Sequence, residues 1–142
     1  MQSHPLDRLV LDTNVIVSAV INNQLEEIVS LSAIHQIEIY TCQKQLAEIQ
    51  QTLSKPKVKK YLAETPQIFI ETFLLTAVVV EIDERFDRSP DPDDNFLFDL
   101  AYTVKSHYIV TREKALLNLK QVNKIKIISM AELRKMIVKK TT

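Results

Sequence analysis

The residues best suited to chemistry follow the first hydrophobic run of the chain. Leu9, Val10 and Leu11 favour a β-strand, and they lead directly into Asp12. A short run that is hydrophobic on both sides indicates a central strand of a parallel sheet, because helices cover both faces of such a strand. Asp12 then lies at the carboxyl end of that strand, where open α/β sheets bind their ligands. The alternative is that Asp12 only caps the helix that follows.

A second group of acids precedes a predicted helix that begins near Pro92. Asp91 and Asp93 suit the N-terminus of that helix, because the helix dipole favours negative charge there. Asp94 instead lies on the side that carries the hydrophobic residues, and a carboxylate that points inward needs a partner or a cation. Asp99 falls on another side of the helix, where we expect a solvated or ion-paired residue.

Polar residues also follow a later predicted strand that ends at Val110. Thr111 and Glu113 then fall at the same edge of the sheet as Asp12. The same pair is also an ordinary way to begin a helix. Glu48 lies on the flank of a hydrophobic stripe in an earlier helix, and its spacing alone does not distinguish it from an exposed glutamate.

Carboxylates gathered at one edge of a sheet repel one another and raise their own pKa values. A hard divalent cation such as Mg²⁺ or Mn²⁺ removes that repulsion, since it prefers oxygen ligands. Such a site fits the hydrolysis of a phosphodiester, in which the metal activates water and neutralises the leaving oxygen. The single cysteine, Cys42, excludes a cysteine-based zinc site, and the absence of glycine excludes glycine-rich phosphate loops.

The elements that must position these residues alternate between strand and helix. We predict strands at residues 8–11, 37–40, 78–82, 108–111 and 125–128. The predicted helices with clear bounds cover 13–20, 25–31, 46–53, 57–62, 92–104 and 113–119. Another helix begins at Pro66, and its predicted buried residues are Ile68, Phe69, Phe73 and Leu75. The last helix is capped by Ser129, and its predicted buried residues are Leu133, Ile137 and Val138. This alternation indicates a three-layer α/β/α fold whose central, mostly parallel sheet has about five strands.

Length and charge limit the remaining options. A chain of 142 residues suits a single domain over residues 1–142. Lys and Arg number 18, as do Asp and Glu, so nucleic acid would have to bind a local basic face. Lys57, Lys60 and Arg112 offer such a face, although the lysines also fit a solvated helix surface. The sequence has no signal-peptide pattern and no run long enough to span a membrane, so we expect a cytoplasmic protein.

Four motifs taken together resemble the PIN-domain ribonucleases, and most closely the branch of toxin components of toxin–antitoxin pairs. The resemblance covers the chain from Leu9 to about Ile137. The motifs are Leu11-Asp12-Thr13-Asn14, Glu48-Ile49 before Leu53, Asp91-Pro92-Asp93-Asp94-Asn95 with Ala101, and Val110-Thr111.

The resemblance implies roles for individual residues. Asp12, Glu48 and Asp94 would bind the metal, Asp91 would be an accessory acid, and Asn14 would support Asp12. Family members usually carry Thr-x-Asp after the fourth strand. Here Thr111 is retained as a supporting residue, and Glu113, which replaces that aspartate, would reach a second ion through water.

The activity implied by this resemblance is cleavage of single-stranded RNA by a metal-dependent endoribonuclease that uses Mg²⁺ or Mn²⁺. Lys57, Lys60 and Arg112 would contact the RNA, a cognate antitoxin would be the protein partner, and a homodimer is expected. A non-catalytic module of the same fold that binds RNA or protein is the main alternative, because Glu113 and Ala115 stand where the family usually has aspartate. A phosphoaspartate hydrolase needs Asp-x-Asp, and this chain has Asp12-Thr13-Asn14.

Overall fold

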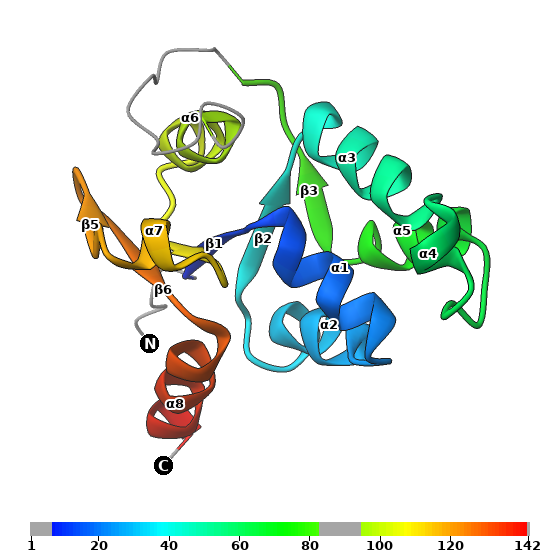
Figure 1. Ribbon diagram of the computed structural model, residues 1–142. Helices are drawn as coiled ribbons and strands as arrows, with labels where there is room; N and C mark the ends of the chain where they lie inside the picture. Colours follow the sequence, from blue (N-terminus) through cyan, green and yellow to red (C-terminus); the bar gives the residue numbers. More distant parts are fainter. Residues whose placement is uncertain (1–6, 83–94, 142) are drawn as a thin grey trace.

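A sheet of six strands runs through the part of the chain that the structure, a computed structural model, describes, which is residues 7–82 and 95–141 (Figure 1). The strands lie in the order β3-β2-β1-β4-β6-β5. All neighbours are parallel except β5 and β6. The elements are β1 (Arg8–Leu11), α1 (Thr13–Ile21), α2 (Leu25–Ala33), β2 (Glu38–Thr41), α3 (Gln43–Leu53), α4 (Pro56–Lys59), α5 (Pro66–Phe73), β3 (Ala77–Val79), α6 (Asn95–Thr103), β4 (Tyr108–Val110), α7 (Lys114–Leu117), β5 (Gln121–Val122), β6 (Ile125–Ile128) and α8 (Met130–Thr141).

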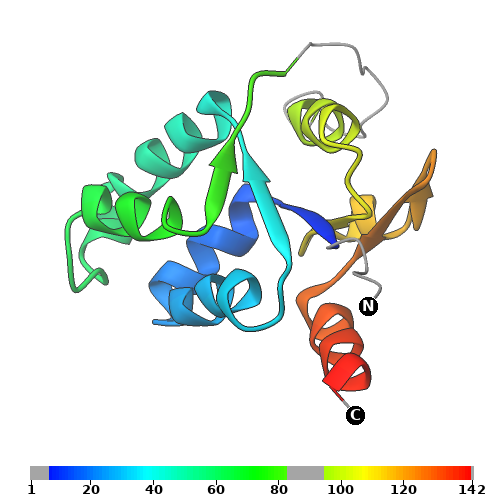
Figure 2. The ribbon, with the colours of Figure 1, turned by 180° about the vertical axis from the view of Figure 1, so that it is seen from behind.

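Helices cover both faces of this sheet. Successive side chains of a strand point to opposite faces, and in β1 Leu9 and Leu11 pack with α1, α2, α3 and α5, whereas Val10 packs with α6 and α7. Figures 1 and 2 show α1, α2, α3 and α5 gathered on one side and α6 on the other. The predicted three-layer α/β fold with a mostly parallel sheet is therefore confirmed.

The register of the central strands brings two polar residues to one edge. Leu11 pairs with Val110, and Val110 pairs with Ile128. The backbone N–H of Asp12 continues the ladder by donating to the Val110 carbonyl oxygen at 2.8 Å. The Thr111 N–H does the same to Ile128 at 2.9 Å. Asp12 and Thr111 therefore directly follow two adjacent strands and lie side by side at the carboxyl edge of the sheet.

Two strands differ from the prediction. The sheet has a sixth strand, β5, which forms an antiparallel hairpin with β6 and was not predicted. It is two residues long and mostly exposed, so it carries no hydrophobic pattern that sequence reasoning can detect. The third strand is Ala77–Val79 rather than 78–82. It lies at the edge of the sheet, where Val78 and Val79 are 49% and 40% exposed.

Some predicted core positions are exposed. In α5 the buried residues are Pro66, Ile70 and Phe73, while Ile68 and Leu75 are 42% and 80% exposed. Only a narrow side of α5 contacts α3 and α2, so some of the residues predicted to be buried lie outside this contact. In α8, Leu133 is buried as predicted, but Val138 is 60% exposed.

Helix α6 is buried almost all round. Six consecutive residues, from Phe96 to Ala101, are buried. Asp99 is among them at 2% exposure, so of the two predicted alternatives, a solvated or an ion-paired side chain, the structure contradicts the first. Residues 96–101 of this helix have no side that faces solvent, so a residue that lies away from the main hydrophobic stripe is buried as well. The predicted start of this helix at Pro92 lies outside the described residues.

Turns without glycine use residues with a positive φ. Among the described residues these are Asn23, Gln36, Lys105, Lys120 and Asn123, with φ between 53° and 61°. Asparagine tolerates this left-handed region better than most residues. These positions lie after helices or in the β5–β6 turn, where proteins commonly have glycine. In this chain the same positions carry amide or ammonium side chains.

The last helix begins with a capping box and is tied to α2 by an ion pair. The Glu132 N–H donates to Ser129 Oγ at 3.1 Å, as the predicted cap requires. Arg134 donates to both carboxylate oxygens of Glu27, at 2.8 and 2.9 Å. None of the helices in residues 7–82 and 95–141 has the length and hydrophobicity needed to cross a membrane.

The Glu27–Arg134 pair should make a small contribution to stability that depends on pH. Arg134 lowers the pKa of Glu27 below its ordinary 4.5. The contribution is therefore complete above pH 4.5 and is lost as the pH falls through the lowered value. Both side chains are over one-third exposed, so we expect Glu27→Gln to lower the free energy of unfolding by only about 0.5 kcal/mol at pH 7.

The measurement is urea denaturation at pH 7 and at pH 3. Glu26→Gln is the matched control, because Glu26 shares the first turn of α2 and its interaction with the helix dipole. An equal loss of stability in both variants would mean that the dipole, and not Arg134, is the source of the effect.

Candidate active site

Asp12 is a buried acid at the carboxyl end of the central strand. It is 3% exposed and occupies the N-cap position of α1, but its side chain makes no capping hydrogen bond. Instead, Asp12 Oδ2 accepts a hydrogen bond of 2.7 Å from the Thr111 hydroxyl. One oxygen of the Asp12 carboxylate is therefore held by a residue of another strand and not by the helix that it precedes.

Thr111 is itself held in place by the next residues of the chain. The Glu113 backbone N–H donates to Thr111 Oγ1 at 3.0 Å. Because that N–H occupies a lone pair of the hydroxyl oxygen, the hydroxyl proton is directed toward Asp12. Thr111 is fully buried, so this donor is kept away from competing water.

The environment of Asp12 raises the pKa of its carboxyl group. Burial is the main cause that raises its pKa above the ordinary 3.8, and the negative charge of Glu113 adds to the shift. The Thr111 hydroxyl and the backbone N–H groups of Asn14 and Thr13 act in the opposite direction. A carboxylate in this state gains from a nearby cation, which would favour the charged form.

Glu48 comes to the same region from α3. It is half-buried, and its Oε2 accepts a hydrogen bond of 3.2 Å from the Thr13 hydroxyl. Thr13 directly follows Asp12 and is the first residue of α1. The structure therefore links Asp12, Thr111 and Glu113 in one group and connects Glu48 to it through Thr13.

Sequence reasoning missed the residue that anchors α3 beneath this group. Gln45 is fully buried, accepts a hydrogen bond of 2.6 Å from the Thr41 hydroxyl, and donates to the Leu11 carbonyl oxygen at 2.6 Å. Gln45, Ile49 and Leu53 are the buried residues of α3, and they repeat every four positions. This four-residue spacing can be detected in the sequence. It places the buried side of α3 closer to Glu48 than the stripe of Leu46, Ile49 and Leu53 does.

A groove runs along α1 and includes Glu113 of the Asp12 group in its wall. It has a volume of about 450 Å³, and its walls include Asn14 and Ser18 on one side and Arg112 and Glu113 on the other. Asn14 and Arg112 are exposed, so both present polar groups to solvent at its surface.

Lys57 and Lys60 lie elsewhere. Both are exposed, and they belong to α4 and its end, beyond the C-terminus of α3. An α-helix of 11 residues spans about 16 Å, so α3 separates them from the sheet edge where β2 ends. The structure does not bring these lysines to the Asp12 group.

The described acids alone do not complete a metal site. Within residues 7–82 and 95–141, no group of three or more His, Cys, Asp or Glu side chains is close enough to hold an ion. The predicted site residues Asp91 and Asp94, and their neighbour Asp93, lie outside the described residues. The convergence of Asp94 with Asp12 and Glu48 therefore stays a prediction.

Comparisons with known proteins identify related chains. A family model described as PIN domain matches residues 8–115. The uncharacterized protein MJ1680 from Methanocaldococcus jannaschii is 34% identical over 121 residues, which cover 82% of this chain and 77% of that protein. A similar fold is found in the crystal structure of VapBC2 from Rickettsia felis bound to a DNA fragment from their promoter. The matching chain there is 16% identical, with a TM-score of 0.56, and the match covers 86% of this chain and 98% of that chain.

Replacing the buried acid should stabilise the protein in the absence of metal. Between its ordinary pKa and its raised native pKa, folded Asp12 holds a proton that the unfolded chain has released, so stability falls as the pH rises through this window. We expect Asp12→Asn to raise the free energy of unfolding at pH 7 by on the order of 1 kcal/mol. The gain should vanish below pH 3.8, where the unfolded acid is also protonated.

Thermal and urea denaturation in EDTA measure this effect. Thr111→Val is the matched variant, because it removes only the donor and leaves Asp12 buried without it. We expect that variant to lose about 1–3 kcal/mol. A loss of stability in Asp12→Asn at pH 7 would show that the native contacts already compensate the charge.

Proposed function

The chain belongs to the PIN domain family, and on this basis we propose that it is a metal-dependent endoribonuclease that cleaves single-stranded RNA. PIN domains are generally nucleases that use divalent metal ions. We further propose that it acts in the cytoplasm as the toxin of a toxin–antitoxin pair. The fold similarity to a VapBC complex supports this part of the proposal.

The observation that carries the proposal is the buried Asp12 carboxylate at the edge of the sheet. Its pKa is raised by burial and by the charge of Glu113, so a cation bound there would stabilise its charged form. The side chains of Thr111, Glu113, Thr13 and Glu48 near Asp12 carry oxygen atoms. This donor set fits Mg²⁺ or Mn²⁺, which prefer oxygen ligands.

We assign Asp12, Glu48 and Asp94 as the residues that would hold the ion, with Asp91 as an accessory acid and Glu113 as an outer ligand. When bound, the ion would supply an activated water and neutralise charge on the leaving oxygen. Thr111 keeps one oxygen of Asp12 in a fixed direction. Thr13 does the same for Glu48, and Asn14 stands at the entrance to the site.

The groove beside α1 suits a single strand of RNA. Arg112 stands on its wall next to Glu113, and an arginine there can bind a phosphate with two parallel hydrogen bonds. Asn14 and Ser18 on the facing wall can donate and accept hydrogen bonds. Lys57 and Lys60 would then contact a more distant part of the same RNA.

A homodimer is also part of the proposal. The edge strand β3 exposes Val78 and Val79, and the end of α5 next to it exposes Leu74 and Leu75. Unprotected edge strands are sites where a second chain can pair. We propose that this edge serves the dimer and that the antitoxin binds over the Asp12 groove, where it would exclude RNA.

Loss of the Asp12 charge should abolish cleavage. We expect Asp12→Asn to reduce the single-turnover rate on a labelled single-stranded RNA by at least about 10²-fold in Mg²⁺ or Mn²⁺, because the acid holds the ion that forms the nucleophile. Glu48→Gln and Asp94→Asn should act in the same direction. Glu38→Gln is the control, since Glu38 begins β2 at the opposite end of the sheet.

Glu113→Asp extends this test, because it restores the acid that the family usually carries there. Equal or higher activity would support a second ion. Undiminished cleavage by purified Asp12→Asn would reveal a contaminating nuclease. Absence of cleavage by the wild type and by Glu113→Asp over many RNAs, with binding retained, would favour a non-catalytic binding module.

RNA affinity should depend more on Arg112 than on the lysines of α4. Arg112 lines the groove beside the site, whereas Lys57 and Lys60 lie past the end of α3. We expect Arg112→Gln to weaken binding by about tenfold, near 1.4 kcal/mol, and Lys57→Gln with Lys60→Gln to weaken it less while reducing the salt dependence. Filter binding with Asp12→Asn as the background measures affinity without cleavage. A larger loss in the lysine pair would place the RNA path over α4.

A further inference from the structure

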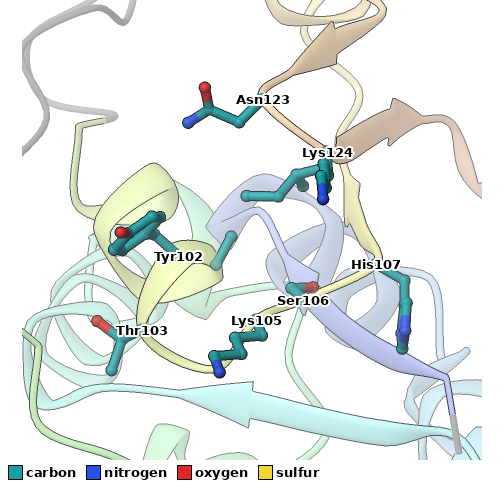
Figure 3. Close-up of a pocket in the computed structure, with 9 residues that line it drawn as sticks. Tyr102, Thr103, Lys105, Ser106, His107, Asn123 and Lys124 are labelled. Carbon is teal, nitrogen blue, oxygen red and sulfur yellow. The ribbon is translucent and has the colours of Figure 1, made fainter. Parts of the chain in front are cut away.

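A second cavity lies at the opposite end of the strands from Asp12. It has a volume of about 700 Å³ and is formed where the end of α6, the loop before β4 and the β5–β6 turn meet. In Figure 3, Tyr102 extends from the last turn of α6, Lys105 lies in the loop, and Asn123 and Lys124 come from the turn. Because β1, β4 and β6 are parallel, this cavity is at their amino ends and Asp12 is at the carboxyl end.

The wall of the cavity is held in place by buried hydrogen bonds. The Ser106 hydroxyl lies 2.7 Å from the Tyr108 carbonyl oxygen and 2.9 Å from that of Arg8, and Ser106 is 5% exposed. The His107 imidazole accepts a hydrogen bond of 3.0 Å from the Arg8 N–H through Nδ1. The loop therefore has a fixed shape, and a ligand would enter a cavity that is already formed.

Among the described residues that line this cavity, the charged side chains are lysines. Lys105 and Lys124 line it, and no aspartate or glutamate is found among the described residues of its lining. Neither ammonium group forms an ion pair or a hydrogen bond with another described residue. Two lysines that have no ion-pair partner among the described residues, in one concave site, suit a phosphate group, for which lysine acts as a point charge.

The rest of the lining suits a planar ring. Ala101 and Ile125 lie beneath the cavity at 0% and 5% exposure, and the ring of Tyr102 is half-exposed at the cavity. An aromatic ring of this kind can stack on any base. The Asn123 amide can both donate to and accept from the edge of a base. The volume lies within the range of about 300–1,000 Å³ that is usual for small-molecule sites.

We propose that this cavity is a binding site for a small nucleoside phosphate, separate from the nuclease site. The phosphate would lie between Lys105 and Lys124, and the base would lie against Tyr102 within reach of Asn123. The site does not depend on the proposed cleavage of RNA, because none of its residues belongs to the Asp12 group.

The test is a titration of the ¹⁵N-labelled full chain with AMP, GMP, CMP and UMP, followed by amide chemical shifts. We expect saturable shifts at residues 101–107 and 123–125, with those of Asp12 and Thr111 unchanged. Lys105→Gln with Lys124→Gln should weaken binding at least about tenfold. Lys120→Gln with Lys126→Gln is the matched control, because it removes the same charge from exposed lysines that do not line the cavity.

Inorganic phosphate and the unphosphorylated nucleosides should each bind more weakly than the nucleotides, because each lacks half of the ligand. The spectra of both double variants show whether they are folded. Absence of shifts at millimolar nucleotide, shifts centred on Asp12, or an equal loss of affinity in the control variant would overturn the proposal. Binding of RNA oligonucleotides alone, without binding of mononucleotides, would also overturn it and would assign the surface to RNA.

Discussion

The burial of the Asp12 carboxylate is the constraint on which the rest of the site depends. An acid that is 3% exposed needs a donor that water cannot replace, and Thr111 supplies it from a position 99 residues later. This contact requires β4 to lie next to β1 in the register that pairs Leu11 with Val110. The strand order of the sheet is therefore also the condition for the chemistry, since another neighbour for β1 would leave Asp12 without its donor.

Much of the fold could be predicted because the central strands and their covering helices have clear periodic patterns. Leu9, Val10 and Leu11 are all fully buried, and a short run of this kind is typical of a strand that helices cover on both faces. Prediction failed where burial is partial. Strand β5 is short and exposed, β3 lies at the edge, and α5 buries a narrower side than its hydrophobic content suggests. At these places long-range packing, and not the local pattern, decides which residues lie inside.

The candidate site was predicted unevenly for a related reason. The proximity of Asp12 and Thr111 followed from the general rule that the ends of parallel strands meet. The rule gives no orientation for side chains that reach the site from helices. The hydrogen bond between Glu48 and Thr13 and the buried contacts of Gln45 depend on how α3 packs on α1, which the sequence does not specify. The solvated alternative predicted for Asp99 failed because α6 is buried on more than one side.

A net charge of zero conceals an uneven distribution of charge along the strands. Asp12 and Glu113 follow the carboxyl ends of β1 and β4. Lys105 and Lys124 precede the amino ends of β4 and β6. These two pairs lie at opposite ends of the strands, although Arg112 also follows β4 and Glu38 begins β2 at the amino ends. Because β4 is only three residues long, about 10 Å separates its two ends. Salt screens solvent-exposed charges at about this distance, but it screens a buried charge such as that of Asp12 much less, so the two ends of the sheet are not electrically independent.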